Sequence, residues 1–374
     1  MPADLWNEAM RMAGCGVAVG MAAAPFGLAG WLMSRRLREP VLPSPSKVRV
    51  PWTGFEVVVA FLMLNMVVPG ITSAALAQSP FFQWIYGPEF PVATEAAPSF
   101  EAEAAAAGTP VSVAAHETKE ERIAVRTLWT GLIALPFQVG LLILIGRISF
   151  PAWRLPAKLR TAPTSITIAI LAWAVLTPIV LLIHSVVNLL FAYLNIMPES
   201  HPLSKLSASQ SHLDQFLFLA QAGLATPFIE EIMFRGLLLG WLFGGRSLFD
   251  RESRSLSPPA SGRRIWIVLG ISAAMARLTS GPHSLGPVLF AAVLIVGWAL
   301  LNRKMRSKRR TVGAIYASAA FFAVVHSGVW PTPIPLFILG LGLGWLALRT
   351  RGILAPTIVH GLFNTVSVVF VLRG

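Results

Sequence analysis

The stretch TPFIEEIMFRG, residues 226–236, places three ionisable side chains inside an apolar run: the adjacent carboxylates Glu230 and Glu231, and Arg235. An ionised group near the middle of a membrane-spanning helix costs about 3 kcal/mol or more, so such groups normally face a protein interior or an aqueous cavity. We therefore expect these charged side chains to face other helices or an aqueous cavity, and to have a structural or chemical role there.

The composition is that of an integral membrane protein. Of 374 residues, 55% are hydrophobic and only 13% are charged, and the mean hydropathy is +0.66. The formal net charge of +13 comes from basic residues in short clusters between apolar runs, which is typical of cytoplasmic loops. We therefore expect the lipid bilayer, and no nucleic acid, as a partner. The single cysteine, Cys15, excludes an internal disulfide framework.

Apolar runs of about 20 residues, the length that crosses a bilayer, predict an all-α polytopic bundle of transmembrane helices. The long runs lie near 12–33, 52–77, 127–146, 166–195 and 216–245. Shorter runs follow near 265–280, 285–302, 311–327, 334–349 and 353–372. We predict ten spans, with eight or nine as alternatives, and allow re-entrant or broken helices among the shorter runs.

The loops between these runs alternate in charge. Every second loop is basic, as in RKMRSKRR at 303–310, while the longest of the others, near 78–126, is acidic. By the positive-inside rule, both termini and the acidic loop lie outside the cytoplasm. We expect an integral, multi-pass protein in a plasma (inner) membrane of the bacterial type.

The two carboxylates of the opening stretch differ in their neighbours. Glu231 and Arg235 are four residues apart, on one helix face, and can neutralise each other. Glu230 points about 100° away and lacks that partner. One carboxylate is thus expected to be structural, and the other to be available for chemistry.

Two further polar pairs occur in the last apolar runs. FFAVVHSG places Phe322 and His326 four residues apart, and IVHGLFNTV does the same for His360 and Asn364, so each pair projects from one helix face. A pocket among the C-terminal helices could then hold a Glu, two His and an Asn.

That set of side chains suffices for hydrolysis by water. A carboxylate takes a proton from water, an imidazole holds the water or passes the proton on, and His and Asn donors stabilise the oxyanion. The sequence has no GxSxG elbow, and Cys15 is remote from the cluster, so a covalent nucleophile is less favoured.

These residues also resemble a known family. EEIMFR, FAVVH and HGLFN are similar, in order and in helix context, to the EExxxR, FxxxH and HxxxN motifs of the CPBP family, the CAAX-protease and bacteriocin-processing membrane proteins also called ABI proteins. The resemblance covers about residues 226–372. It implies an intramembrane endopeptidase of the CAAX prenyl protease 2-like type, best known for cleaving prenylated CAAX proteins.

The resemblance implies a role for each motif residue. The catalytic residues would be Glu230 as general base on water, His326 as its partner, and His360 with Asn364 as the oxyanion site. The supporting residues would be Glu231, Arg235 and Phe322. A metal-free glutamate mechanism is favoured, so no cofactor is expected. The alternative is zinc held by Glu230, His326 and His360.

The chain is predicted to have two regions. Residues 1–215 form an N-terminal transmembrane region with the acidic loop near 78–126, and residues 216–374 form a CPBP-like catalytic core. Within the core, residues 246–310 insert a basic loop and a helical pair where the family commonly has a short connection. This pair is faintly similar to the pair that follows it, which indicates either a degenerate duplication or chance.

The expected substrate is a membrane-anchored or amphiphilic peptide or protein. A non-catalytic membrane scaffold or immunity protein is the alternative function. A transporter is less favoured, although intramembrane charges also mark ion paths. Activity after Glu230→Gln separates a protease from a scaffold.

Overall fold

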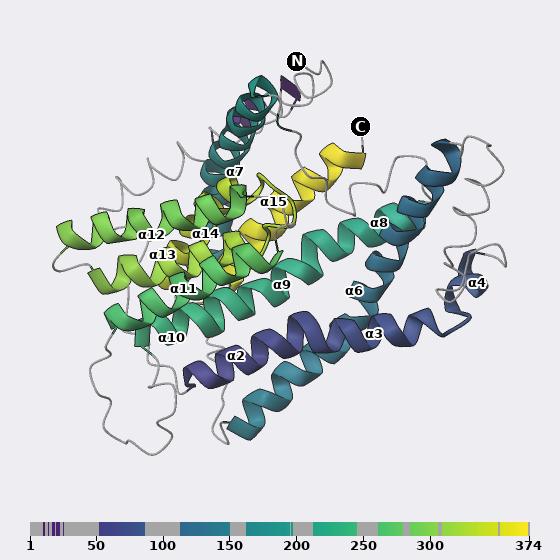
Figure 1. The fold of residues 1–374 in the computed structure, drawn as a ribbon, viewed down its shortest axis with the longest axis horizontal. Coiled ribbons are helices and arrows are strands. Elements are labelled where there is room, and N and C mark those ends of the chain that lie inside the picture. The colour runs from purple at the N-terminus through teal and green to yellow at the C-terminus, as the bar shows by residue number, and fades with distance from the viewer. Residues whose placement is uncertain are drawn as a thin grey trace.

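The structure is a computed structural model. It describes residues 52–86, 113–149, 162–194, 212–244, 261–279, 285–305, 309–350 and 352–372, with residue 196 and isolated positions between 10 and 25. Throughout these residues the regular secondary structure is helical, which confirms the all-α prediction (Figure 1). Most of the first predicted span, near 12–33, lies outside the described residues.

The N-terminal region contributes long helices. One continuous rod consists of α2 (Gly54–Leu62), the π-helical segment η1 (Met63–Val67) and α3 (Val68–Ala77). The short α4 (Phe81–Tyr86) follows it, and then come α6 (Val113–Ser149) and α7 (Ala162–Tyr193).

The C-terminal region begins with a second interrupted rod. This rod consists of α8 (His212–Ala220), η4 (Gln221–Ala225), α9 (Thr226–Glu231), η5 (Ile232–Leu238) and α10 (Leu239–Gly244). The later helices are α11 (Ser261–Thr279), α12 (Gly286–Lys304), α13 (Arg309–Val324), α14 (Pro333–Thr350) and α15 (Leu354–Leu372).

Prolines account for two of the π-helical segments. Pro69 follows η1 and Pro227 follows η4, each near the start of the next α-helical stretch. A proline has no N–H to donate to the carbonyl four residues back, and its ring crowds that carbonyl. A wider π turn just before the proline lets the helix continue without that bond.

Within the described residues, six helices are long and apolar enough to cross a membrane. They are Gly54–Ala77, Arg122–Leu144, Ile166–Tyr193, His212–Phe243, Gly286–Lys304 and Pro333–Thr350. Of two shorter apolar helices, Leu354–Phe370 carries the third motif, while Thr311–Val324 carries Phe322 of the second motif and ends before His326. The chain is thus a polytopic helix bundle, and the count of ten spans stays a prediction.

The acidic segment near 78–126 is more helical than a loop. It includes α4, and α6 already begins at Val113. The stretch from Val113 is rich in Ala, Glu, Lys and Arg, which are strong helix formers, so its charge does not stop it from extending the helix. The Tyr86 hydroxyl at the end of α4 donates to Asp214 Oδ1 at 2.5 Å and accepts from Trp129 Nε1 at 2.7 Å, which ties α4 to α8 and α6.

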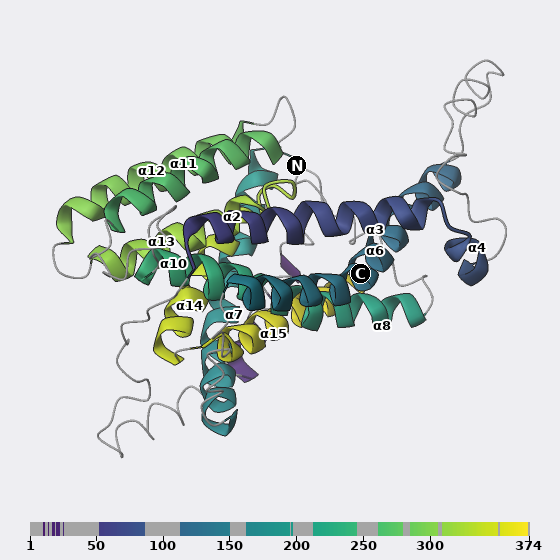
Figure 2. The same cartoon turned by 90° about the horizontal axis from the view of Figure 1, so that it is seen from below.

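The inserted pair α11 and α12 covers one side of α13. Figure 2 shows α11 and α12 on that side, while α14, α15 and α7 lie on the other. The hydroxyl of Tyr316 donates to Leu294 O at 2.7 Å, and the Trp298 indole packs on Gly313. The pair α11 and α12 therefore packs outside the motif helices, which contact one another directly, and its origin as an insertion stays a prediction.

Glycines allow α14 to approach α13 closely. A Cβ atom on Gly340 would lie 3.1 Å from Ala319 Cα, and one on Gly344 would lie 3.2 Å from Ile315 Cγ2. This spacing reflects helix packing, as small residues do where membrane helices meet. The close approach at Gly340 also leaves its carbonyl oxygen within reach of Arg235.

We expect Gly313→Ala to lower the stability of the chain. The new Cβ would lie 2.6 Å from Cη2 of Trp298, which is 1% exposed and has no room to move. Overpacking of this kind costs about 1–3 kcal/mol. The measurement is thermal unfolding of the full chain in detergent, with Gly140→Ala as control because a Cβ there meets nothing within 4 Å. Equal melting temperatures for Gly313→Ala and the native chain would contradict the packing described.

Candidate active site

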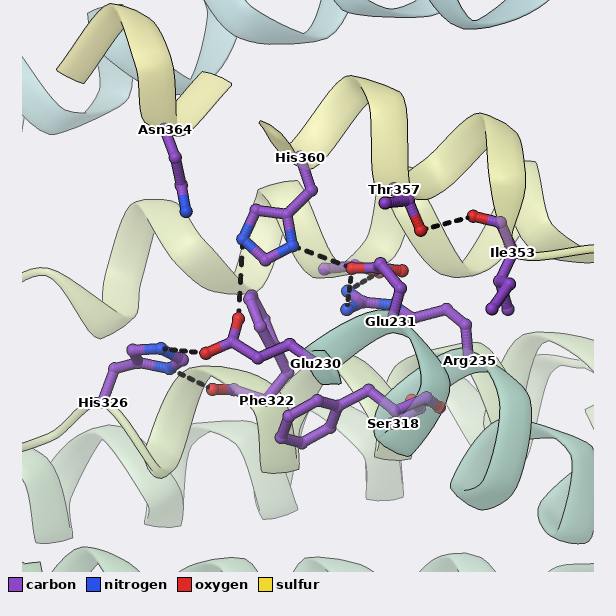
Figure 3. A network of polar contacts seen from close by, with 12 residues as sticks. Glu230, Glu231, Arg235, Ser318, Phe322, His326, Ile353, Thr357, His360 and Asn364 are labelled. Carbon is purple, nitrogen blue, oxygen red and sulfur yellow. Dashed lines mark hydrogen bonds and ion pairs between the residues drawn. The ribbon is translucent and has the colours of Figure 1, made fainter. Parts of the chain in front are cut away.

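The site is built around α9, which carries Glu230 and Glu231 between two π-helical segments. Helix α15 supplies His360, and the turn after α13 supplies His326. Figure 3 shows Glu230, Glu231, Arg235, Phe322, His326 and His360 converging on one region. The structure thus brings together six of the seven residues singled out in the sequence, and Asn364 lies to one side.

Glu231 and Arg235 form the expected ion pair. Arg235 Nη1 lies 2.7 Å from Glu231 Oε1, and both side chains are fully buried. The same carboxylate oxygen accepts a bond from His360 Nδ1 at 2.9 Å. The guanidinium of Arg235 also lies over the Phe322 ring, 4.5 Å from its centroid, and donates to Gly340 O at 3.5 Å. This pair therefore joins α9 and η5 to α13, α14 and α15.

Glu230 points away from that pair and lies between two imidazoles. Its Oε1 is 3.6 Å from His326 Nε2, and its Oε2 is 3.6 Å from His360 Nε2. The Glu230 side chain is 16% exposed and that of His326 is 30% exposed, whereas His360 is only 3% exposed. The partly open side of the cluster is therefore the side of His326.

The remaining bonds of the two rings assign their protons. His326 Nδ1 lies 2.7 Å from the carbonyl oxygen of Phe322, which can only accept, so Nδ1 carries a proton. His360 Nδ1 faces the Arg-paired carboxylate of Glu231, so it too is a donor. In each ring, Nε2 is left to face Glu230. A neutral ring presents a lone pair there, and a protonated ring presents a donor.

Phe322 packs against three members of the cluster. Its ring meets the His326 ring at 5.0 Å and the His360 ring at 5.5 Å, both edge to face, and the Arg235 guanidinium lies over it. It is completely buried. From the sequence we expect Phe322 only to share a helix face with His326. In the structure, the Phe322 ring lies between His326 and the buried ion pair of Glu231 and Arg235.

Asn364 binds the backbone of the EExxxR helix. Its Nδ2 donates to Ala222 O at 3.0 Å, within η4, and Figure 3 shows it on the far side of His360 from Glu231. Next to it, a Cβ on Gly361 would overlap the carbonyl oxygen of Gly223, so α15 and η4 meet backbone to backbone. Asn364 thereby anchors the helix that carries His360, and its role at an oxyanion stays a prediction.

Side chains from other parts of the chain bind backbone carbonyls of the π-helical segments in the same way. The segments η1, η4 and η5 each accept at least one such bond. Ser318 donates to Phe234 O, Trp52 to Leu237 O, and Gln138 to Leu64 O. Reasoning from the sequence missed Ser318 and Trp52, which position the rod that carries the carboxylates. For η1 and η4, the proline that follows each segment is the sequence feature that could have predicted a backbone carbonyl free to accept a bond from another side chain.

Zinc was the alternative for this cluster, with Glu230, His326 and His360 as ligands. Among the residues that the structure describes, no group of three or more His, Cys, Asp or Glu side chains is arranged to hold a metal ion. Zinc binding at these residues stays a prediction.

Comparison with known families agrees with the motifs. Residues 212–366 match the family model described as Rce1-like, type II CAAX prenyl endopeptidase. This confirms the CAAX-protease resemblance and supports an intramembrane protease in general. With the apolar helices, it makes the chain an integral, multi-pass membrane protein. Neither a curated protein sequence nor a solved structure matches the chain.

We expect Arg235→Met to destabilise the chain strongly. It leaves the Glu231 carboxylate buried without its cation, and breaking one half of a buried pair costs about 3–5 kcal/mol. Adding Glu231→Gln removes the orphaned charge, so the double variant should recover part of the loss. Thermal unfolding in detergent measures both. A single variant as stable as the native chain would mean that the pair does not hold these helices together.

Proposed function

We propose, from the match of residues 212–366 to the Rce1-like type II CAAX prenyl endopeptidase family model, that the chain is an intramembrane endopeptidase in which Glu230 activates water. The observation that carries the proposal is the position of Glu230 between His326 Nε2 and His360 Nε2, 3.6 Å from each. A partly exposed carboxylate flanked by two proton acceptors fits the removal of a proton from water.

Charge balance supports a shared proton in this cluster. Arg235 neutralises one carboxylate, and two carboxylates are present. Because an unpaired charge is costly in a low-dielectric interior, the cluster is neutral when one further proton resides among Glu230, His326 and His360. That proton can move between the carboxylate and the two Nε2 atoms without leaving the site.

The proposed reaction needs two proton transfers. Glu230 takes a proton from water as the oxygen attacks the peptide carbonyl carbon, and the proton then passes to the leaving amine as the C–N bond breaks. His326, on the more exposed side, holds the water or carries the proton. Product release exposes a new carboxyl terminus and a new amine.

The developing oxyanion needs donors. His360 Nε2 donates when its ring carries the additional proton, and Asn364 has a second N–H beyond the one bound to Ala222. Glu231 keeps the Nδ1 proton of His360 in place, and Arg235 and Phe322 hold Glu231 and both rings. Glu231, Arg235 and Phe322 are therefore positioning residues in this proposal.

The proposed substrate is a membrane-anchored or amphiphilic peptide or protein. The carboxylates of the site lie on His212–Phe243, which is long and apolar enough to span a bilayer, and the Glu230 and His326 side chains are partly exposed. A substrate segment would have to reach that depth, as a lipid-anchored or amphiphilic chain can. We place the protein in a plasma membrane of the bacterial type, and we favour the metal-free mechanism over zinc.

Glu230→Gln is expected to abolish cleavage. The amide keeps the shape of the side chain but does not take a proton from water, so turnover should fall at least about 100-fold. The measurement compares peptide termini in the membrane proteome of cells with the native chain and cells with Glu230→Gln, at matched membrane levels. Termini found only with the native chain would also identify the substrate.

Lys304→Gln is the matched control, because Lys304 lies at the end of α12, outside the cluster. It should give the native set of termini. Identical termini from the native chain and Glu230→Gln would refute the protease proposal and favour a non-catalytic membrane scaffold or immunity protein.

A further inference from the structure

His326 is held differently from the other cluster residues. Helix α13 ends at Val324, and His326 lies in the turn that follows. The His326 N–H donates to Ala323 O at 3.1 Å, and its carbonyl accepts from Val329 N at 3.1 Å. His360, by contrast, lies within α15. The orientation of the His326 ring therefore depends on the conformation of this turn.

Trp330, at the far end of the same turn, is clamped by two other helices. Its indole meets the Phe191 ring of α7 at 6.0 Å and the Phe290 ring of α12 at 6.1 Å. It also lies flat against the backbone of Gly286, where a Cβ atom would be 2.6 Å from Cε2 and 2.7 Å from Nε1. Only a residue without a side chain leaves room for the indole in this position.

The turn contacts the inserted helical pair at both of its helices. Besides Trp330 on α12, a Cβ atom on Gly328 would lie 4.0 Å from the carbonyl oxygen of Thr279, the last residue of α11. The Val329 to His326 bond links this clamped end of the turn to the histidine. Thus α11 and α12, which contribute no residue to the cluster, meet the segment that carries His326, whose side chain is more exposed than those of Glu230 and His360.

We propose that Trp330 is a positioning residue and that the inserted pair α11–α12, through Gly286 and Phe290, sets the distance between His326 and Glu230. The catalytic part of this inference rests on the proposed protease function, whereas the geometric part does not. The insertion is thus a component of the site and not a passive addition at the edge of the bundle.

Gly286→Ala tests the proposal in the full-length chain. The new Cβ must displace the indole, which Phe191 and Phe290 hold on its other sides. Replacing the indole by a smaller ring, in Gly286→Ala with Trp330→Phe, should relieve the overlap. Gly270→Ala in α11 is the matched control, because a Cβ there meets nothing within 4 Å.

Two readouts separate geometry from catalysis. The first is the ring ¹⁵N signal of His326 in the spectrum of the full chain in detergent, labelled with ¹⁵N-histidine. The chain has 7 histidines, so the spectrum has few signals, and the one that disappears in His326→Gln is that of His326. The second is kcat and KM on a quenched-fluorescent peptide with a prenylated CAAX terminus. Misplacement by about 1 Å lowers turnover by about 10- to 100-fold.

We expect Gly286→Ala to shift the His326 signal and to lower kcat in that range with KM within about twofold, and the double variant to reverse both. A shifted signal with no cleavage even by the native chain would support the positioning and count against the proposed function. An unchanged His326 signal in Gly286→Ala overturns the proposal, whatever kcat does. If Gly286→Ala does not fold, Phe290→Leu removes one wall of the clamp without adding volume and carries the same expectation.

Discussion

The buried ion pair of Glu231 and Arg235 is the interaction on which the site depends. Two opposite charges that are fully buried among apolar helices stabilise each other, because either one left unpaired there would be costly. Arg235 pairs with Glu231 and also contacts the Phe322 ring and the Gly340 carbonyl. The close approach of α14 to α13 at Gly340 brings that carbonyl within reach. One pair thus fixes the relative positions of four helices.

The same pair differentiates two carboxylates that are adjacent in the sequence. Glu231 faces the cation and the Nδ1 atom of His360, and the helix geometry then directs Glu230 to the opposite atoms of two imidazoles. Each ring has one nitrogen committed to a fixed acceptor and one facing Glu230. Paired groups in unlike environments are a common basis for acid and base roles in enzymes. Here a single helix turn is enough to create the difference.

Sequence reasoning predicted the parts of this site that depend on helix periodicity and the cost of charge in a membrane. The Glu231–Arg235 pair, the divergent direction of Glu230 and the shared helix face of His360 and Asn364 follow from residue spacing alone. Phe322 and His326 do not share a helix face as expected, because α13 ends at Val324 and His326 lies in the turn that follows. Spacing does not select bonding partners, however. His184 and Asn188 in α7 have the same H-x₃-N spacing and bond to each other at 2.9 Å, whereas His360 and Asn364 bond to Glu231 and to the backbone of Ala222.

The features that sequence reasoning missed depend on contacts between distant segments. The bond of Trp52 to η5, the clamp on Trp330 and the backbone contact of Gly361 with Gly223 each need two helices to be placed first. The early start of α6 was missed because a charged segment was interpreted as a loop, although its residues favour a helix.

The most direct test of this account is the protonation of the two ring nitrogens of His326 and His360, measured by ¹⁵N spectroscopy of the full chain in detergent. The account predicts a proton on Nδ1 of both rings, and loss of this preference for His360 alone when Glu231 is changed to Leu, which has no acceptor for the Nδ1 proton. A ring with a bare Nδ1 and a protonated Nε2 in the native chain would contradict it, because Nε2 could not then accept a proton on the side that faces Glu230.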